Sequence, residues 1–141
     1  MRWCRFVLAA FIAGVAGQIL HGLCGGILAR FYLMTPELFR EFSPKVLIGY
    51  FIVNLFMGLV LALVFYFAQR ILPGTPLRKG LIFGITVWLV TSIAGNATRY
   101  LSSPIVWELA LGETLEDFVV YLVQGVIIAF ILVEENTAPV V

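Results

Sequence analysis

The chain has 141 residues, of which 62% are hydrophobic and only 12% are charged, and its formal net charge is +1. Soluble domains carry roughly 45–50% apolar and about 25% charged residues, so this composition excludes an ordinary soluble fold. The nine Lys and Arg residues are scattered between apolar runs, which excludes the basic stripe expected of a nucleic-acid-binding protein.

Four apolar segments predict an all-α fold of four transmembrane helices. They cover about residues 6–28, 46–68, 80–101 and 115–133, and each is close to the ~20 residues that cross a bilayer. The first is longer than the roughly 7–15 apolar residues of a signal peptide, so we expect it to remain as a membrane helix. The spans and their short connections make 1–141 a single transmembrane domain and leave no room for a catalytic one.

One face of the first span combines small and polar residues. At helical spacing it carries Ala10, Gly14, Gly17, Gln18, His21, Gly22 and Gly25. Small residues let helices approach closely in lipid, so we predict a packing face at which Gly17→Ala is mildly and Gly17→Leu severely destabilising. The alternative is the wall of a pore or cofactor groove, to which Gln18 and His21 supply polar atoms.

His21 is the only histidine in the chain. Its ring could ligate haem iron or a chlorophyll magnesium, although a hydrogen-bonded packing role is the favoured interpretation, and the sequence identifies no other cofactor. Zinc-type sites are not expected, because Cys4, Cys24 and His21 lack the required ligand spacing. The two cysteines lie about 30 Å apart on one helix, too far for a disulfide.

Serine or threonine followed by proline or by acidic residues marks the starts of helices. This pattern precedes three of the spans, at Ser43, Thr75 and Thr114. It also opens segments 36–42 and 104–111, which are too short to span and place Leu, Phe and Trp beside charges. We predict that both segments form short amphipathic helices lying in the same membrane interface.

The remaining spans each carry one patch of small and polar residues. Asn54 precedes Gly58 in the second span, Gly84 and Ser92 share a stripe of the third, and Gln124 lies in the fourth. The predicted helix-packing residues are Gly14, Gly17, Gly22, Gly25, Gly58 and Gly84. The predicted polar path, if the interior conducts a solute, consists of Gln18, His21, Asn54, Gln124 and Arg99.

The predicted spans have no Asp, Glu or Lys in their interiors, and such residues usually mark proton relays and cation-coupled transport. The sequence therefore disfavours proton-driven transport. The sequence also lacks a nucleophile elbow, a workable Cys/His pair and paired carboxylates within a span. We accordingly expect that the protein is not an enzyme.

Two stretches resemble bacterial fluoride channels, which are small four-helix proteins acting as dual-topology dimers. They are residues 25–31, which read GGILARF, and Asn54 with Gly58 in the second span. The resemblance implies that Asn54 lines a pore. The chain departs from the family because residues 91–100 contain no phenylalanine to serve as an aromatic fluoride ligand, and because its Gly-Arg element ends the first span instead of starting it.

The distribution of basic residues predicts the topology. The side that holds both termini carries five Lys or Arg and the opposite side carries four, so the positive-inside rule places both termini in the cytoplasm, with a bacterial-type inner membrane as the expected location.

Three functions remain open at the level of sequence. The favoured one is a non-catalytic accessory or packing subunit, whose partners are the lipid bilayer and other membrane chains or copies of itself. The alternative is an oligomeric channel or carrier for a small neutral or anionic solute, and a further alternative is haem or pigment binding through His21.

Overall fold

The computed structural model describes residues 2–34 and 43–133, and these contain helices and no strand. Its elements are α1 (Arg2–Tyr32), α2 (Pro44–Ala68), α3 (Pro76–Trp88), the π-helix η2 (Leu89–Ile93), α4 (Ala94–Ser102) and α5 (Trp107–Leu132). α3, η2 and α4 follow one another without a break and form a single span. Four spans are long and apolar enough to cross a bilayer, which confirms the predicted all-α membrane bundle.

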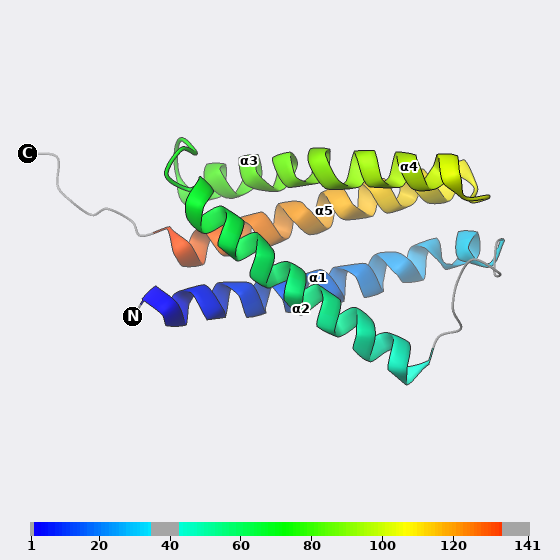
Figure 1. Cartoon of the computed structure of the whole chain (residues 1–141), viewed down its shortest axis with the longest axis horizontal. Coiled ribbons are helices and arrows are strands. Elements are labelled where there is room, and N and C mark those ends of the chain that lie inside the picture. The colour runs from blue at the N-terminus through cyan, green and yellow to red at the C-terminus, as the bar shows by residue number, and fades with distance from the viewer. Residues whose placement is uncertain (1, 35–42, 134–141) are drawn as a thin grey trace, which may run out of the picture.

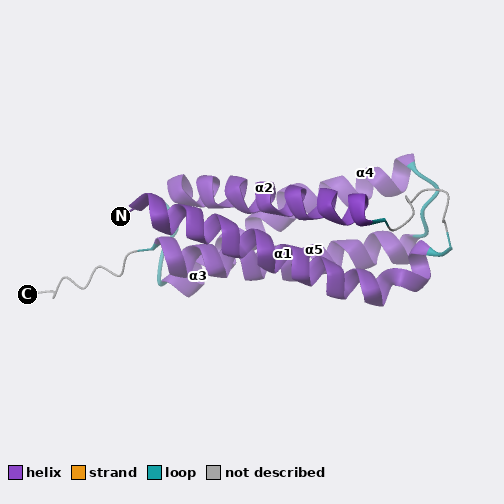
Figure 2. Ribbon diagram, turned by 90° about the horizontal axis from the view of Figure 1, so that it is seen from below, coloured by secondary structure: helices purple, strands orange, loops and turns teal. Residues whose placement is uncertain are grey.

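The four spans run along the long axis of an elongated bundle (Figures 1 and 2). α1 packs against both α2 and α5, and α3 packs against α5. α2 crosses α1 obliquely, so that its beginning leans away from α4 while its end approaches the beginning of α3 (Figure 1). The beginning of α1 and the end of α5 lie at the same end of the bundle (Figure 1).

Two of the predicted helix starts have the expected caps. The Ser43 hydroxyl accepts a hydrogen bond from the backbone N–H of Val46, and the Thr75 hydroxyl accepts one from that of Arg78, both at 3.4 Å. Proline occupies the first helical position in each case, where its missing N–H and fixed φ are tolerated. The sequence therefore located the starts of α2 and α3 correctly.

The predicted interfacial helix at 104–111 and the predicted start of the fourth span at Thr114 are both wrong. Residues 107–132 form one continuous helix. Thr114 does not cap it, because its hydroxyl donates to the carbonyl of Ala110 at 2.7 Å, as threonine does inside a helix. Leu109 is fully buried, so the segment packs inside the bundle instead of lying flat in the interface. The other predicted interfacial helix, at 36–42, lies outside the described residues.

The apolar core lies toward the end of the bundle that holds the beginning of α1. Phe65 and Phe83 meet edge to face there, with ring centroids 5.2 Å apart. The core residues are Ala10, Ala13, Leu61, Ala62, Phe65, Phe83, Ile128 and Ala129. All four spans contribute to this cluster, which therefore fastens the bundle together at that end.

Glycines set the two closest helix crossings. A Cβ at Gly14 would lie 2.9 Å from the backbone of Leu55, and a Cβ at Gly58 would meet the backbone of Ala10 and Gly14. On the other side of the bundle, a Cβ at Gly84 would lie 2.9 Å from the backbone of Leu122. Because these contacts are with backbone, even alanine would force the helices apart.

Two further α3–α5 contacts involve glycines outside the predicted packing set. Cβ atoms at Gly80 and Gly125 would each lie 2.7 Å or less from the other residue's carbonyl oxygen. Gly22 and Gly25, by contrast, have no atom within 4 Å of a Cβ position in the described chain. A packing role for these two requires another molecule and stays a prediction.

Candidate functional site

A hydrogen-bonded pair joins α1 to α5 in the part of the bundle beyond the apolar core. The Nδ1 atom of His21 lies 2.6 Å from Oε1 of Glu116. Glu116 is only 9% exposed, whereas the His21 side chain is 35% exposed. Charged groups inside spanning helices are rare, and they usually pair with one another and face a bundle interior or a polar cavity.

A second ion pair lies one turn of α5 away, toward the end of α1. Nη1 of Arg99 donates to Oε2 of Glu113 at 2.6 Å, and the hydroxyl of Tyr32 donates to Oε1 of the same carboxylate at 3.1 Å. Three spans thus meet at one carboxylate. Long basic side chains at helix ends reach toward the membrane interface, so this ion pair marks the mouth of the polar region.

A third set of contacts connects the end of the third span to α5. Nδ2 of Asn96 lies 3.3 Å from Oδ2 of Asp117 and 3.2 Å from the hydroxyl of Thr114. The indole N–H of Trp88 donates to the backbone carbonyl of Thr114 at 2.8 Å. These bonds hold the Asp117 carboxylate against the turns around η2.

The deepest polar contacts involve three amide side chains. Nδ2 of Asn54 donates to Oε1 of Gln18 at 2.9 Å and to the carbonyl of Tyr50 at 3.0 Å. Nε2 of the buried Gln124 donates to the carbonyl of Ala13 at 3.0 Å. A Cβ at Gly17 would collide with the Gln124 amide, so this glycine makes the space in which the amide is held.

We therefore expect Gly17→Ala to be more destabilising than the sequence alone suggested. The new methyl group would displace the buried Gln124 amide from its bond to Ala13, and an unsatisfied buried polar group costs about 1–3 kcal/mol. Gly22→Ala, which meets no atom within 4 Å, is the matched control. Thermal unfolding in detergent measures the stability of both variants. Equal melting temperatures would contradict the role of Gly17 in making space for the Gln124 amide.

The ion pairs and amide contacts lie at successive positions along the long axis of the bundle. Glu116 lies sixteen residues before the end of α5 at Leu132, which is about 24 Å along the helix axis. A hydrocarbon core ~30 Å thick that begins at that end of α5 would include the His21–Glu116 pair near its far boundary. Gln124 then lies near the middle of the membrane. With the membrane placed in this way, the polar region would reach from one surface to about mid-membrane, where the apolar core begins.

The sequence-based expectation that no acidic residue lies inside a span is wrong. Glu113, Glu116 and Asp117 follow one another on α5 at positions that share one face, and each is hydrogen-bonded to a residue of another span. The error followed from starting the last span at Leu115. With α5 beginning at Trp107, the spacing of three and four residues from Glu113 places the three carboxylates on one helix face, and this spacing could have been read from the sequence.

The structure places all five residues of the predicted polar path within this polar region. Gln18 and Asn54 bond to each other, and Gln124 lies beside them across Gly17. His21 and Arg99 each bind a glutamate of α5; the predicted span 115–133 left Glu113 outside and placed Glu116 in its first turn. We name the side chains that make these contacts the polar network. Its members are Tyr32, Arg99, Glu113, His21, Glu116, Asp117, Asn96, Gln18, Asn54 and Gln124.

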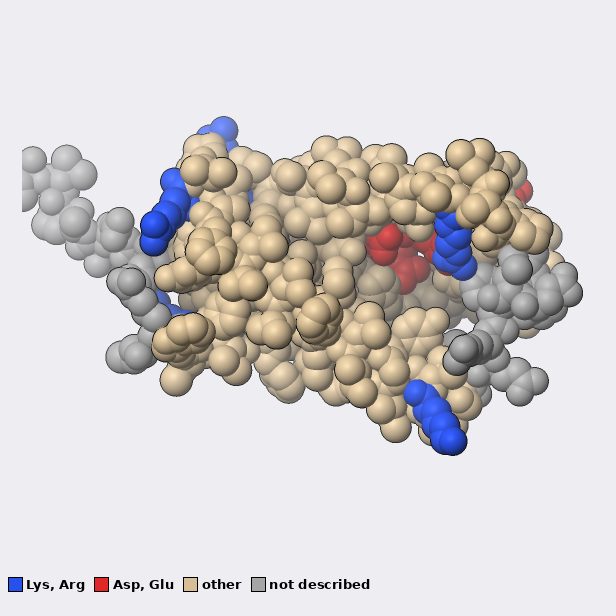
Figure 3. All heavy atoms as spheres, viewed as in Figure 1, with Lys and Arg blue, Asp and Glu red and all other residues tan. Residues whose placement is uncertain are grey.

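Part of the polar network is open to the surface. Figure 3 shows Asp and Glu atoms at the bottom of a hollow beside a basic side chain, in the half of the molecule that contains α4. The local charge is unbalanced, because three carboxylates face one arginine and one histidine. The hollow therefore attracts positive charge.

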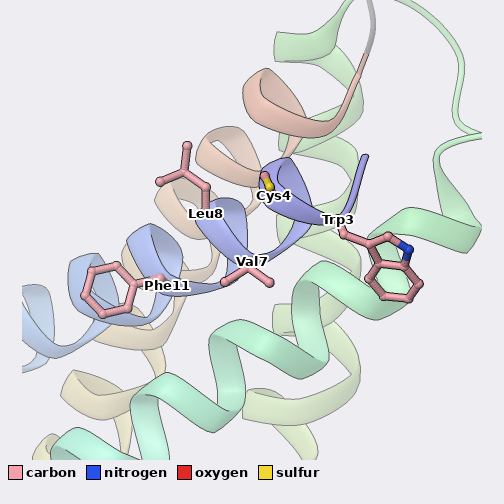
Figure 4. Close-up of a pocket in the computed structure, with 5 residues that line it drawn as sticks. All are labelled: Trp3, Cys4, Val7, Leu8 and Phe11. Atoms are coloured by element: carbon pink, nitrogen blue, oxygen red, sulfur yellow. The ribbon is translucent and has the colours of Figure 1, made fainter. Parts of the chain in front are cut away.

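A different hollow, at the beginning of α1, is apolar. It is lined by Trp3, Cys4, Val7, Leu8 and Phe11, whose side chains lie along the outside of the helix (Figure 4). Such a surface suits lipid chains and offers no convergent polar groups. We therefore place the candidate site at the polar network.

No group of three or more His, Cys, Asp or Glu side chains in the described part of the chain is arranged to hold a metal ion. The Nδ1 contact with Glu116 orients the His21 ring, as carboxylates do for ligating histidines. The hypothesis that His21 binds haem or a pigment stays a prediction, and an absorption spectrum of protein purified from its native membrane tests it.

Comparisons with protein-family models, with curated proteins and with solved structures found no match. They give the resemblance to fluoride channels no support.

Proposed function

We propose that this chain is a small membrane carrier or channel for protons or other small cations. The observation that carries the proposal is the His21–Glu116 pair, which lies inside two spanning helices at 2.6 Å. Intramembrane ionisable residues are costly, and in membrane proteins they typically mark ion pathways and proton relays. A bundle that needed only to pack could use apolar side chains at both positions.

The sign of the transported charge follows from the network. The sequence favoured a neutral or anionic solute because the acidic residues were expected outside the spans or in the first turn of the last one. Three carboxylates face one arginine and one histidine in the network, so the network is net negative even with the histidine protonated, and an anion would be repelled and a cation attracted. We therefore replace the anionic alternative with a cationic one.

The His21–Glu116 pair suits proton handling. A proton on either partner leaves the pair neutral as a whole, so moving it between Nδ1 and Oε1 does not change the net charge buried there. The exposed part of His21 gives the pair access to the surface. The Arg99–Glu113–Tyr32 cluster lies one turn of α5 closer to the mouth than this pair.

The polar network ends at about mid-membrane, so transport requires a further element. Either the helices rearrange to open the apolar core around Phe65 and Phe83, or a second copy continues the path. We propose a homo-oligomer, because a four-helix bundle alone packs solid. We also propose that both termini are cytoplasmic in a bacterial-type inner membrane, in keeping with the five-to-four bias of basic residues.

Ion flux in liposomes tests the proposal. Purified protein is reconstituted with a trapped pH-sensitive dye, and a proton gradient or a Na+ or K+ gradient is applied in turn. We expect flux for at least one of these ions and a loss of at least about tenfold in Glu116→Gln, as for removal of a residue that handles the proton directly. Glu108→Gln, a neutralised glutamate in the first turn of the same helix, should retain wild-type flux. Absence of flux for all three ions in the wild type would refute the proposal.

An accessory-subunit function remains the second candidate. Gly22, Gly25 and Gly26 meet no atom of the described chain, and the neighbouring Leu23 and Ile27 are 64% and 76% exposed. A face with small residues between exposed apolar ones suits contact with another membrane helix. Purification from native membranes in mild detergent tests this function, which requires a stoichiometric second protein; a preparation containing only this chain would contradict it.

A further inference from the structure

Three basic residues surround the short connection between α2 and α3. Arg70 and Arg78 are exposed, and Lys79 is half-buried. Nζ of Lys79 donates to the backbone carbonyl of Gln69, the residue that ends α2, at 2.8 Å. This bond ties the beginning of α3 to the end of α2 and brings the ammonium group to the residue next to Arg70. We name Arg70, Arg78 and Lys79 the basic turn.

The backbone of this connection is constrained. Gly74 has a φ of 96°, which favours glycine, and a Cβ there would lie 2.7 Å from Cδ of Arg78. The Arg78 side chain therefore lies across the connection at Gly74. Pro73 and Pro76 each restrict φ, and the Thr75 hydroxyl caps α3. The basic side chains accordingly extend from a backbone of fixed shape.

No acidic side chain pairs with the basic turn in the part of the chain that the structure describes. The described acidic residues lie in the first half of α5, toward the opposite end of the bundle (Figure 1). Arg2 and Arg5 begin α1 at the same end as the basic turn, and Glu134 and Glu135 follow α5 in the sequence. Five basic residues against two acidic ones leave this end with a net charge of +3, and Figure 3 shows Lys and Arg atoms gathered there.

Exposed apolar side chains flank the basic turn. Ile71, within the connection, is 84% exposed, and Leu77, in the first turn of α3, is 48% exposed. Exposure of such side chains to water is unfavourable, whereas contact with acyl chains removes their apolar area from water. Cationic and apolar side chains therefore lie together where two spans end, as in protein segments that bind at the level of lipid headgroups.

We propose that the basic turn binds the phosphate headgroup of an anionic phospholipid, with Ile71 and Leu77 against its acyl chains. Guanidinium groups bind phosphate through paired, charge-assisted hydrogen bonds. Basic residues directly beside membrane spans attract anionic lipids. The flanking apolar side chains favour a lipid over a soluble phosphate, which has no apolar part. This site goes beyond the proposed cation transport and does not depend on it.

Thermal unfolding of the whole protein in detergent, titrated with phosphatidylglycerol, tests the site. Binding to the folded state raises the melting temperature. We expect a saturable rise with phosphatidylglycerol and a much smaller one with phosphatidylcholine of the same acyl chains, whose headgroup has no net charge. Arg70→Gln/Arg78→Gln should move the phosphatidylglycerol midpoint to at least about fivefold higher lipid, as expected from the loss of basic residues at an anionic surface.

Arg30→Gln/Lys45→Gln is the matched control, because it removes two exposed basic residues at the opposite end of α1 and at the beginning of α2. It should keep the wild-type midpoint. If the double site variant fails to fold, Arg70→Gln alone should still raise the midpoint at least about twofold. Unchanged midpoints in the site variants, an equal shift in the control, or an equal response to both lipids would overturn the site. A rise of the same size with inorganic phosphate alone would overturn the assignment to a lipid.

Discussion

Gly58→Ala is expected to lower the stability of the protein by about 3 kcal/mol, the upper end of the usual cost of overpacking. The added methyl group would meet the carbonyl of Ala10 and lie 2.6 Å from the backbone nitrogen of Gly14. Neither contact can be relieved by a side-chain rotation, so α1 and α2 must separate. We expect the melting temperature in detergent to fall by about 10 °C.

Gly49→Ala is the matched control for this variant. Gly49 lies on the same helix, and a Cβ there would have no atom within 4 Å. Because alanine favours a helix over glycine by about 1 kcal/mol, Gly49→Ala should leave the melting temperature unchanged or raise it. If Gly58→Ala behaved like Gly49→Ala, the close crossing of α1 over α2 would be wrong.

His21→Leu and Glu116→Leu are each expected to destabilise the protein strongly, whereas the double variant should recover most of the loss. Removing one partner of a buried ion pair costs about 3–5 kcal/mol because the other group is left uncompensated. We expect the lower end of this range for Glu116→Leu, since the His21 side chain that remains is 35% exposed. Two leucines of similar volume leave neither group unpaired, and such replacements are often neutral or stabilising.

A double-mutant cycle based on thermal unfolding measures the coupling between the two residues. We expect the double variant to be clearly more stable than the sum of the two single losses implies. Simple additivity would show that His21 and Glu116 act independently and that the 2.6 Å contact contributes nothing.

Much of the fold could be predicted from the sequence because membrane spans depend on the length and composition of apolar runs. The capped starts at Ser43 and Thr75 were also predictable, since a hydroxyl followed by proline favours a helix start. Ser103 followed by Pro104 has the same pattern, but it ends α4, and α5 begins only at Trp107. Thr114 followed by two acids looked the same, but threonine can equally bond back to its own helix. Choosing between the two requires knowing that Leu109 is buried, which depends on packing across the bundle.

The candidate site was only partly predictable for the same reason. Polar residues such as Gln18 and Asn54 stood out within apolar runs. Glu116 did not, because one misplaced helix start assigned it to the interface. The π-helix at residues 89–93 was also not predictable, since no local pattern of those residues indicated it.

The most direct test of the account is the ion flux through the His21→Leu/Glu116→Leu double variant in liposomes, compared with the wild type at equal amounts of folded protein. If the pair is retained for moving cations and packing alone does not require it, the double variant folds with a stability close to that of the wild type, yet has lost cation flux. A stable double variant that conducts as well as the wild type would contradict a role of the pair in transport.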